Sequence, residues 1–126
     1  MMAAAFAPFV QRAPLCVMAR FTLENLFCPK RLDALFENTA QRQYHKEVLF
    51  SQVTELMMSV VLRVDASVHG AYRKRADILQ VSDQAIYDKL QCMELGVSAA
   101  LVADSATHVA PVIDLLKARL PAWLPG

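Results

Sequence analysis

The sequence predicts an all-α fold. Apolar residues recur three and four positions apart along most of the 126 residues, whereas the strict alternation that is typical of strands is absent. Serine and proline stand at intervals where helices usually begin. The length suits one compact domain with a sizeable core, and no repeat or low-complexity linker divides the chain. We therefore expect a compact multi-helix domain.

The first residues differ from the rest of the chain. Residues 1–20 are predicted to form an irregular N-terminal arm, because Pro8 and Pro14 interrupt an otherwise apolar run. The run has no charged start and contains arginines, which argues against a signal peptide. The helical domain is expected to span residues 21–126.

Two short helices are expected after the arm. Thr22 can cap a short helical turn, and Pro29 stands where the first residue of a helix tolerates proline. The helix that begins at Pro29 has an apolar stripe with helical spacing, formed by Leu32, Leu35 and Phe36.

The longest apolar pattern, from Gln43 to Val64, predicts the central helix of the core. Its apolar residues are Val48, Leu49, Val53, Leu56, Met57, Val60, Val61 and Val64. Polar residues interrupt this run well before the roughly 18 apolar residues that cross a bilayer. No membrane span is therefore expected.

Serines mark the starts of the next two helices. Ser67 is predicted to cap a helix that reaches about Leu79. Ser82 is predicted to cap a second helix, from Asp83 to about Glu94.

The last helix is expected to follow a glycine. Gly96 is predicted to end the preceding helix, and Ser98 to open the final one. Pro111 should kink this final helix or divide it in two.

Charge and cysteine content exclude several classes of protein. Thirteen basic and twelve acidic side chains give a net charge of +1, so any contact with DNA must come from a locally basic face. Cys16, Cys28 and Cys92 form no C-x-x-C pair, which argues against a disulfide framework and a zinc site. They are expected to be buried or half-buried thiols in a reducing cytosol.

The stretch "LQVSDQAIYDKLQ", residues 79–91, has the pattern of a helix-turn-helix unit. Such a unit needs a small residue where its helices touch, and Ala76 supplies one just before the stretch. Leu79 and Val81 flank the turn, and Ile86 and Leu90 lie four residues apart on one face of the second helix, where they can anchor it to the core.

The outer face of that second helix is left polar. Its residues are Asp83, Gln84, Tyr87 and Gln91, at positions that would meet a major groove. Gln80 stands where glycine often supplies a positive φ, and Lys89 where an apolar anchor is usual. Asp83 and Asp88 would repel phosphates. The same pattern is also typical of a helical hairpin whose outer face is merely solvated.

"YRKRAD" places basic residues on the helix before the turn, where the first helix of a helix-turn-helix unit crosses the phosphate backbone. The three are Arg73, Lys74 and Arg75. Consecutive residues spread around a helix, so they cannot all face one strand, and at least one is expected to be an ordinary solvated charge.

Extended stretches of the chain carry a family resemblance. "RFTLENLF", "LFSQVTELMMSVVLRVDASVHGAYRKR", "VSDQAIYDKLQCMELGVSAALV" and "ARLPAWLPG" resemble the N-terminal region of bacterial insertion-sequence transposases with a DDE catalytic domain, in the group usually numbered family four. The resemblance covers roughly residues 16 to 126, nearly the whole chain.

The resemblance implies a DNA-binding role. In such transposases a helical N-terminal region binds the terminal inverted repeats of the element, and a following RNase H-like domain holds divalent metal, expected to be Mg²⁺, for strand cleavage. We expect this chain to be a fragment that ends before that domain, with double-stranded DNA as its partner, no cofactor and no enzymatic activity. The expected location is the bacterial cytoplasm, at the nucleoid.

The expected DNA-binding residues follow from the two motifs. Arg73, Lys74 and Arg75 would hold phosphates, and Ser82, Gln84 and Tyr87 would lie nearest to the bases. No catalytic or metal-binding residue is assigned. The aspartates lie on expected helices or their ends, with no sheet to gather them, and His45, His69 and His108 are far apart in the sequence.

Two other hypotheses remain open. The chain could be a helical module for self-association or for contact with another protein domain, with no direct role in DNA binding. Its high apolar content and near-neutral charge favour that class. A free-standing helix-turn-helix regulator would require a dimer interface, which the sequence does not identify.

Overall fold

The computed structural model describes residues 2–42 and 47–115 of the chain. Every regular element in these ranges is an α-helix, which confirms the predicted all-α class. The helices of the described residues are α1 (Met2–Arg12), α2 (Pro14–Leu26), α3 (Pro29–Thr39), α4 (Phe50–Val61), α5 (Val68–Leu79), α6 (Asp83–Gln91) and α7 (Leu95–Leu115). His45 and the last stretch of the family resemblance lie outside the described residues.

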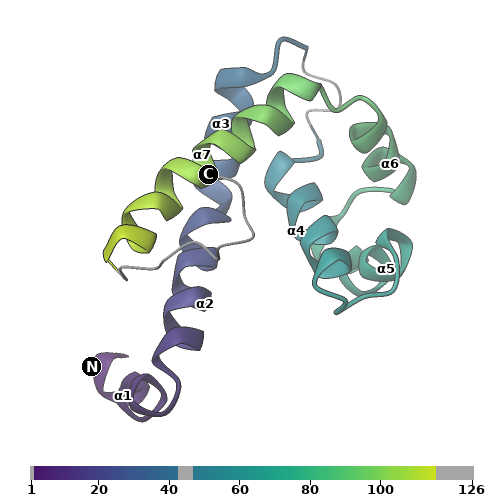
Figure 1. Ribbon diagram of the computed structural model, residues 1–126. Coiled ribbons are helices and arrows are strands. Elements are labelled where there is room, and N and C mark those ends of the chain that lie inside the picture. Colours follow the sequence, from purple (N-terminus) through teal and green to yellow (C-terminus); the bar gives the residue numbers. More distant parts are fainter. Residues whose placement is uncertain (1, 43–46, 116–126) are drawn as a thin grey trace, which may run out of the picture.

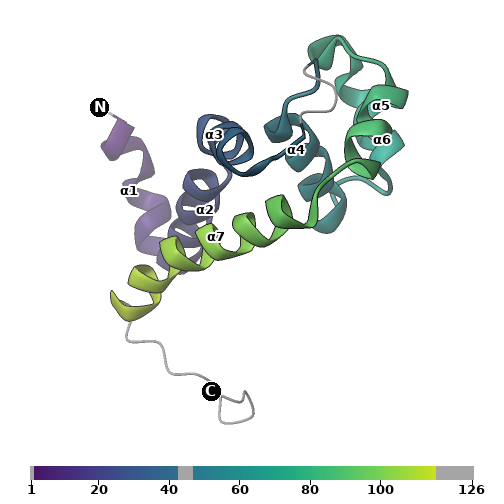
Figure 2. The same ribbon diagram turned by 90° about the horizontal axis from the view of Figure 1, so that it is seen from above.

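Helix α4 connects the two halves of the fold (Figure 1). It packs against α3 on one side and against α5 and α6 on the other. Helix α7 packs against α3 and reaches α2, and α1 packs against α2. In the view from above, α5 and α6 lie at one end of the molecule and α1 at the other (Figure 2). The candidate site on α5 and α6 is therefore held through α4.

Two apolar cores meet at α4. The first core consists of Val48, Val53, Leu56, Ala71, Leu79 and Ile86, and the second of Leu32, Phe50 and Val97. Phe50 also stacks on Phe36 of α3, with ring centroids 5.3 Å apart. Burying a side chain such as Leu56 or Ile86 contributes about 1.5–3 kcal/mol. The first core fixes α5 and α6 to α4, and the second fixes α3 and α7.

The N-terminal segment is helical, and the prediction of irregular backbone over residues 1–20 is wrong. Helix α1 contains Pro8, and Pro14 is the first residue of α2, where its fixed φ and missing N–H suit a helix start. Thr22 therefore lies inside α2 and caps no helix. Alanine-rich sequence in α1 favours the helix. The division of the chain into an arm and a domain stays a prediction.

Helix α4 is shorter than the predicted helix from Gln43 to Val64. Residues 47–49 are not helical, and Gln43 lies outside the described residues. The start is set by α3, because both carboxylate oxygens of Asp33 accept hydrogen bonds from Ser51, one from its N–H and one from its hydroxyl, at 2.8 Å each. This tertiary cap satisfies a backbone donor in the first turn of α4.

The boundary between α6 and α7 also differs from the prediction. Helix α6 ends at Gln91, and Gly96 lies in the first turn of α7, so Gly96 does not end α6 and Ser98 does not open the last helix. The carboxylate of Glu94 accepts hydrogen bonds from the N–H groups of Gln41 and Arg42, at 3.2 and 2.8 Å. This contact holds the residue before α7 against the segment that follows α3.

Helix α7 continues through Pro111 without dividing. Among the described residues, α7 is the one helix long and apolar enough to cross a membrane, judged by length and composition alone. Of its most apolar stretch of 18 residues, 6% is buried inside the fold. Its first half is held to α3, because Val97 is buried and Arg31 donates a 2.5 Å hydrogen bond to Asp104. The absence of a membrane span stays a prediction.

Candidate nucleic-acid interface

A three-residue turn joins α5 to α6. Gln80 ends α5 in the left-handed region at φ 54°, and its N–H donates a hydrogen bond to the Ala76 carbonyl at 3.0 Å. The Tyr72 hydroxyl donates a hydrogen bond to the Val81 carbonyl at 2.7 Å. Ser82 caps α6 as predicted, since its hydroxyl oxygen accepts the N–H of Ala85 at 3.1 Å. The turn is thus held by local hydrogen bonds at each of its residues.

Apolar side chains hold the turn and α6 to the core. Ile86 is fully buried and Leu79 is 8% exposed, while Val81 and Leu90 are partly buried against the first core. These are the anchor positions that the spacing in the sequence predicts. Because these side chains make the contacts with the core, the opposite face of α6 is not needed for packing.

That opposite face is open to solvent. Ser82, Gln84, Tyr87 and Gln91 are all exposed with the described residues in place, and Tyr87 shows 37% of its surface. Helix α6 packs on α4, and α7 runs away from it along α3 (Figure 1). Within the part of the chain that the structure describes, neither the N-terminal helices nor α7 covers this face.

Two of the exposed polar side chains already have partners on α6. The Gln84 side-chain amide donates a hydrogen bond to Asp88 at 2.7 Å. Asp83 accepts the N–H of Gln84 at 2.8 Å and lies 3.6 Å from the imidazole of His69 on α5. Negative charge at Asp83 suits the N-terminus of a helix but repels phosphate. To contact a base, the Gln84 side chain must therefore give up its hydrogen bond to Asp88.

The three basic residues of "YRKRAD" have different surroundings. Arg73 is exposed, with no ion pair among the described residues. Lys74 forms an ion pair with Asp65. Arg75 donates hydrogen bonds to Asp65 and to the Ala71 carbonyl, each at 3.1 Å. The structure therefore leaves Arg73 as the most available of the three for phosphate.

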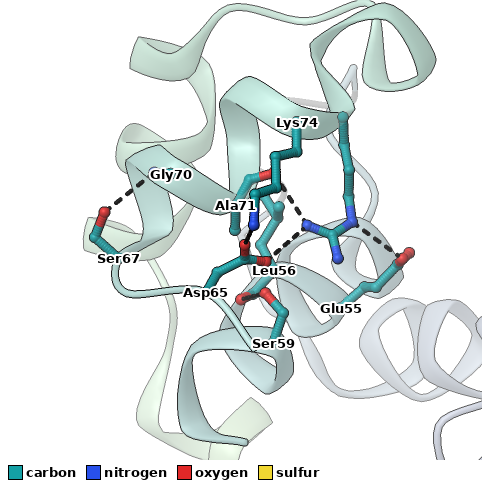
Figure 3. A network of polar contacts seen from close by, with 9 residues as sticks. Glu55, Leu56, Ser59, Asp65, Ser67, Gly70, Ala71 and Lys74 are labelled. Atoms are coloured by element: carbon teal, nitrogen blue, oxygen red, sulfur yellow. Dashed lines mark hydrogen bonds and ion pairs between the residues drawn. The ribbon is translucent and has the colours of Figure 1, made fainter. Parts of the chain in front are cut away.

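Asp65 lies between α4 and α5, beneath Lys74 in the view of Figure 3, and forms ion pairs with Lys74 and Arg75. Its side chain is only 1% exposed, and its N–H donates a hydrogen bond to the Ser59 carbonyl at 3.1 Å. Hydrogen bonds from Lys74 and Arg75 lower the pKa of its carboxyl from 3.8 to about 2, against the opposing effect of burial. Asp65 belongs to the candidate site through these contacts, and the sequence motifs alone do not single it out.

Glu55 completes this group of charges. Its carboxylate lies 3.6 Å from the Arg75 guanidinium, but its side chain is 69% exposed, so water screens the pair (Figure 3). A pattern that could have indicated the group is an aspartate nine and ten residues before two cations, across a turn between helices.

Lys89 faces inward, away from the exposed side of α6. The residue is 5% exposed, and its ammonium lies 4.1 Å from the ring centroid of Phe36 on α3. Burial lowers the pKa of the Lys89 amine, and the charge of Asp33 opposes that shift. A cavity of about 210 Å³ adjoins it, lined by Asp33, Phe36, Glu37, Val48, Leu49, Phe50 and Lys89. At the position of an apolar anchor, Lys89 links α6 to α3.

No cluster of three or more His, Cys, Asp or Glu that could hold a metal ion occurs within residues 2–42 and 47–115. His69 and His108 lie on different helices, each near an aspartate. Cys28 is half-buried as predicted, but Cys16 and Cys92 are exposed, so the prediction of burial is wrong for these two. Comparisons of the chain with protein-family models, with curated proteins and with solved structures find no match.

Proposed function

We propose that the chain is a DNA-binding domain that recognises the terminal inverted repeats of a transposable element. In this proposal α5 and α6 act as a helix-turn-helix unit, with α6 entering the major groove. The observation that carries it is the exposed polar face of α6, which projects from a turn anchored to the core. It is supported by the left-handed Gln80 between the two helices.

The residues divide into two kinds of contact. Arg73 on α5 would bind phosphate directly. Lys74 and Arg75 would bind phosphate only after breaking their ion pairs with Asp65. Gln84 and Tyr87 would lie nearest to base edges, and Ser82 could donate its hydroxyl proton while its oxygen caps α6. Phosphate contacts would set the register, and base contacts the preference for the repeat.

The family resemblance supplies the wider context of the proposal. A domain of this kind would deliver a separate metal-dependent catalytic domain to the ends of the element, so the divalent metal belongs to that domain. The chain itself would bind without catalysing strand transfer, in the cytoplasm of a bacterial cell.

Binding to labelled duplexes tests the proposal. The parent chain is titrated against the terminal inverted repeat of the element that encodes it and against a scrambled duplex of equal length. Gln84→Ala and Tyr87→Ala should each weaken binding to the repeat by about tenfold, with little effect on the scrambled duplex. Arg73→Ala should weaken both and reduce the slope of log Kd against log salt by about 1.

The matched control is Lys30→Ala, which removes an exposed positive charge from α3. It should leave both affinities near those of the parent. Unchanged affinity for the repeat in both Gln84→Ala and Tyr87→Ala would refute the assignment of α6 as the reading helix.

A second candidate function is self-association, and a specific observation favours it. Large apolar side chains are exposed on α1, α2 and α7, including Phe9 at 64%, Leu15 and Phe21 at 68% and Val102 at 70%. These helices are neighbours in the fold, since α1 packs against α2 and α7 reaches α2, and contiguous exposed apolar patches mark interaction surfaces. The occupant we propose is a second copy of the chain.

Sedimentation velocity tests the second candidate. Phe21→Ser should shift the chain toward monomer, whereas Ile78→Ser, which changes an 81% exposed apolar residue on α5, should not. A parent chain that stays monomeric over a wide range of concentrations would rule out self-association.

A further inference from the structure

Two of the three basic residues on α5 are partly neutralised by a carboxylate inside the protein. Lys74 and Arg75 share one carboxylate, that of Asp65, with Lys74 on one oxygen and Arg75 on the other (Figure 3). The cations differ in exposure from their partner, because the Lys74 side chain is 66% exposed and that of Asp65 only 1%. Lys74 therefore faces solvent, and Arg75, whose side chain is 26% exposed, does so only in part, while their shared counter-charge is buried.

This arrangement limits what the two cations can gain from DNA. Affinity for DNA depends on neutralising phosphates and releasing their counterions, and a cation that already has a fixed counter-charge contributes less to that exchange. Moving both cations onto phosphates would leave the buried Asp65 carboxylate without its partners, which is unfavourable.

We propose that Asp65 is an autoinhibitory counter-ion, which keeps Lys74 and Arg75 from binding phosphate and so weakens the affinity of the chain for DNA. The inference rests on the proposed DNA-binding function. In the native chain Arg73 then carries most of the phosphate contact from α5. Neutralising Asp65 should release two further phosphate-binding groups.

The test compares Asp65→Asn with Glu55→Gln in the full chain. Each variant removes one negative charge next to Arg75, but Glu55 is exposed and makes no contact with Lys74 in the described structure. Binding to one duplex DNA is measured over a series of KCl concentrations, and circular dichroism checks that each variant is folded.

We expect Asp65→Asn to steepen the slope of log Kd against log salt by roughly 1 to 2, the value for one or two added phosphate contacts. The affinity of Asp65→Asn for the duplex at low salt should be about tenfold or more higher than that of the parent. The affinity and the salt slope of Glu55→Gln should stay near those of the parent. Equal slopes for Asp65→Asn and Glu55→Gln would overturn the inference.

A second variant covers the case in which Asp65→Asn does not fold. Lys74→Ala leaves Arg75 on Asp65, and it should change the affinity of the chain by less than about twofold, because Lys74 contributes little to phosphate binding while Asp65 holds it. A loss as large as that caused by Arg73→Ala would overturn the inference.

The two proposals fail in different ways. If the parent binds DNA and Asp65→Asn matches Glu55→Gln, only the autoinhibitory role is refuted. If neither the parent nor any folded variant binds duplex DNA, the proposed function and this inference are both refuted. If binding is detected only in Asp65→Asn, the autoinhibitory role is supported directly.

Discussion

The hydroxyl of Tyr72 on α5 donates a 2.7 Å hydrogen bond to the carbonyl oxygen of Val81, in the turn that leads to α6. This bond joins the helix that carries the basic residues to the start of the helix that would read bases. Its donor lies nine residues before its acceptor, so the bond forms only when the chain has reversed direction at Gln80.

Replacing Tyr72 with phenylalanine should destabilise the chain by about 0.5–1.5 kcal/mol, because it removes one hydrogen bond while keeping the ring. Urea unfolding followed by circular dichroism measures the loss. Tyr87→Phe is the matched control, since Tyr87 is 37% exposed and its hydroxyl makes no hydrogen bond among the described residues. Equal loss in the two variants would show that the bond to Val81 contributes nothing specific.

Gln80→Gly should stabilise the chain by about 0.5–1 kcal/mol. Gln80 has φ 54°, where a side chain costs energy that glycine does not, and this gain exceeds the added entropy of the unfolded chain. Gln80→Ala should give no such gain, because alanine keeps the Cβ. Urea midpoints of the two variants check the prediction, which a lower midpoint for Gln80→Gly would contradict.

Ile86→Ala should cost about 2–5 kcal/mol, because Ile86 is fully buried in the first core and its truncation leaves a cavity beneath α6. Ile78→Ala makes the same chemical change on α5 at a side chain that is 81% exposed, and it should cost little. Thermal unfolding of both variants is the measurement. Similar losses would mean that α6 is not anchored through Ile86.

Acid should weaken the chain through Asp65. Its pKa is lowered from 3.8 to about 2 by the hydrogen bonds of Lys74 and Arg75, so its contribution is fully present above the unfolded value of 3.8. That contribution is lost as the pH falls toward and through about 2. In Asp65→Asn the melting temperature should fall less than in the parent as the pH is lowered over this range.

The control for the acid prediction is Asp77→Asn, which replaces an exposed carboxylate on the same helix as Lys74 and Arg75. It should leave the acid dependence close to that of the parent. The same steep fall in Asp65→Asn and the parent would show that other carboxylates dominate acid unfolding.

The features that depend on short-range chemistry could be predicted from the sequence. Ser67 and Ser82 cap α5 and α6 because a hydroxyl needs only the N–H three residues ahead, and the all-α class follows from apolar spacing. Burial of Ile86 followed from the same spacing. Whether the exposed face of α6 binds DNA stays a prediction.

Other features were decided by contacts between distant segments. Helices α1 and α2 are an exception, because alanine content and the position of Pro14 favour both helices locally, whereas prolines within an apolar run predict irregular backbone. The start of α4 depends on Asp33 of α3, and the start of α7 lies beside the segment after α3 that Glu94 binds, so local patterns placed both starts wrongly.

The sequence by itself determined the all-α class, the serine caps of α5 and α6 and the apolar face of α6, because these depend on residues three or four positions apart. Only the tertiary structure decided the environment of the charges. Lys89 is buried against Phe36, and Asp65 holds Lys74 and Arg75, because the fold brings these groups together in space. Spacing along the chain by itself does not fix which cation pairs with which carboxylate. Electrostatic partners are set by distance and burial in space, and so they followed the packing of α3, α4 and α5.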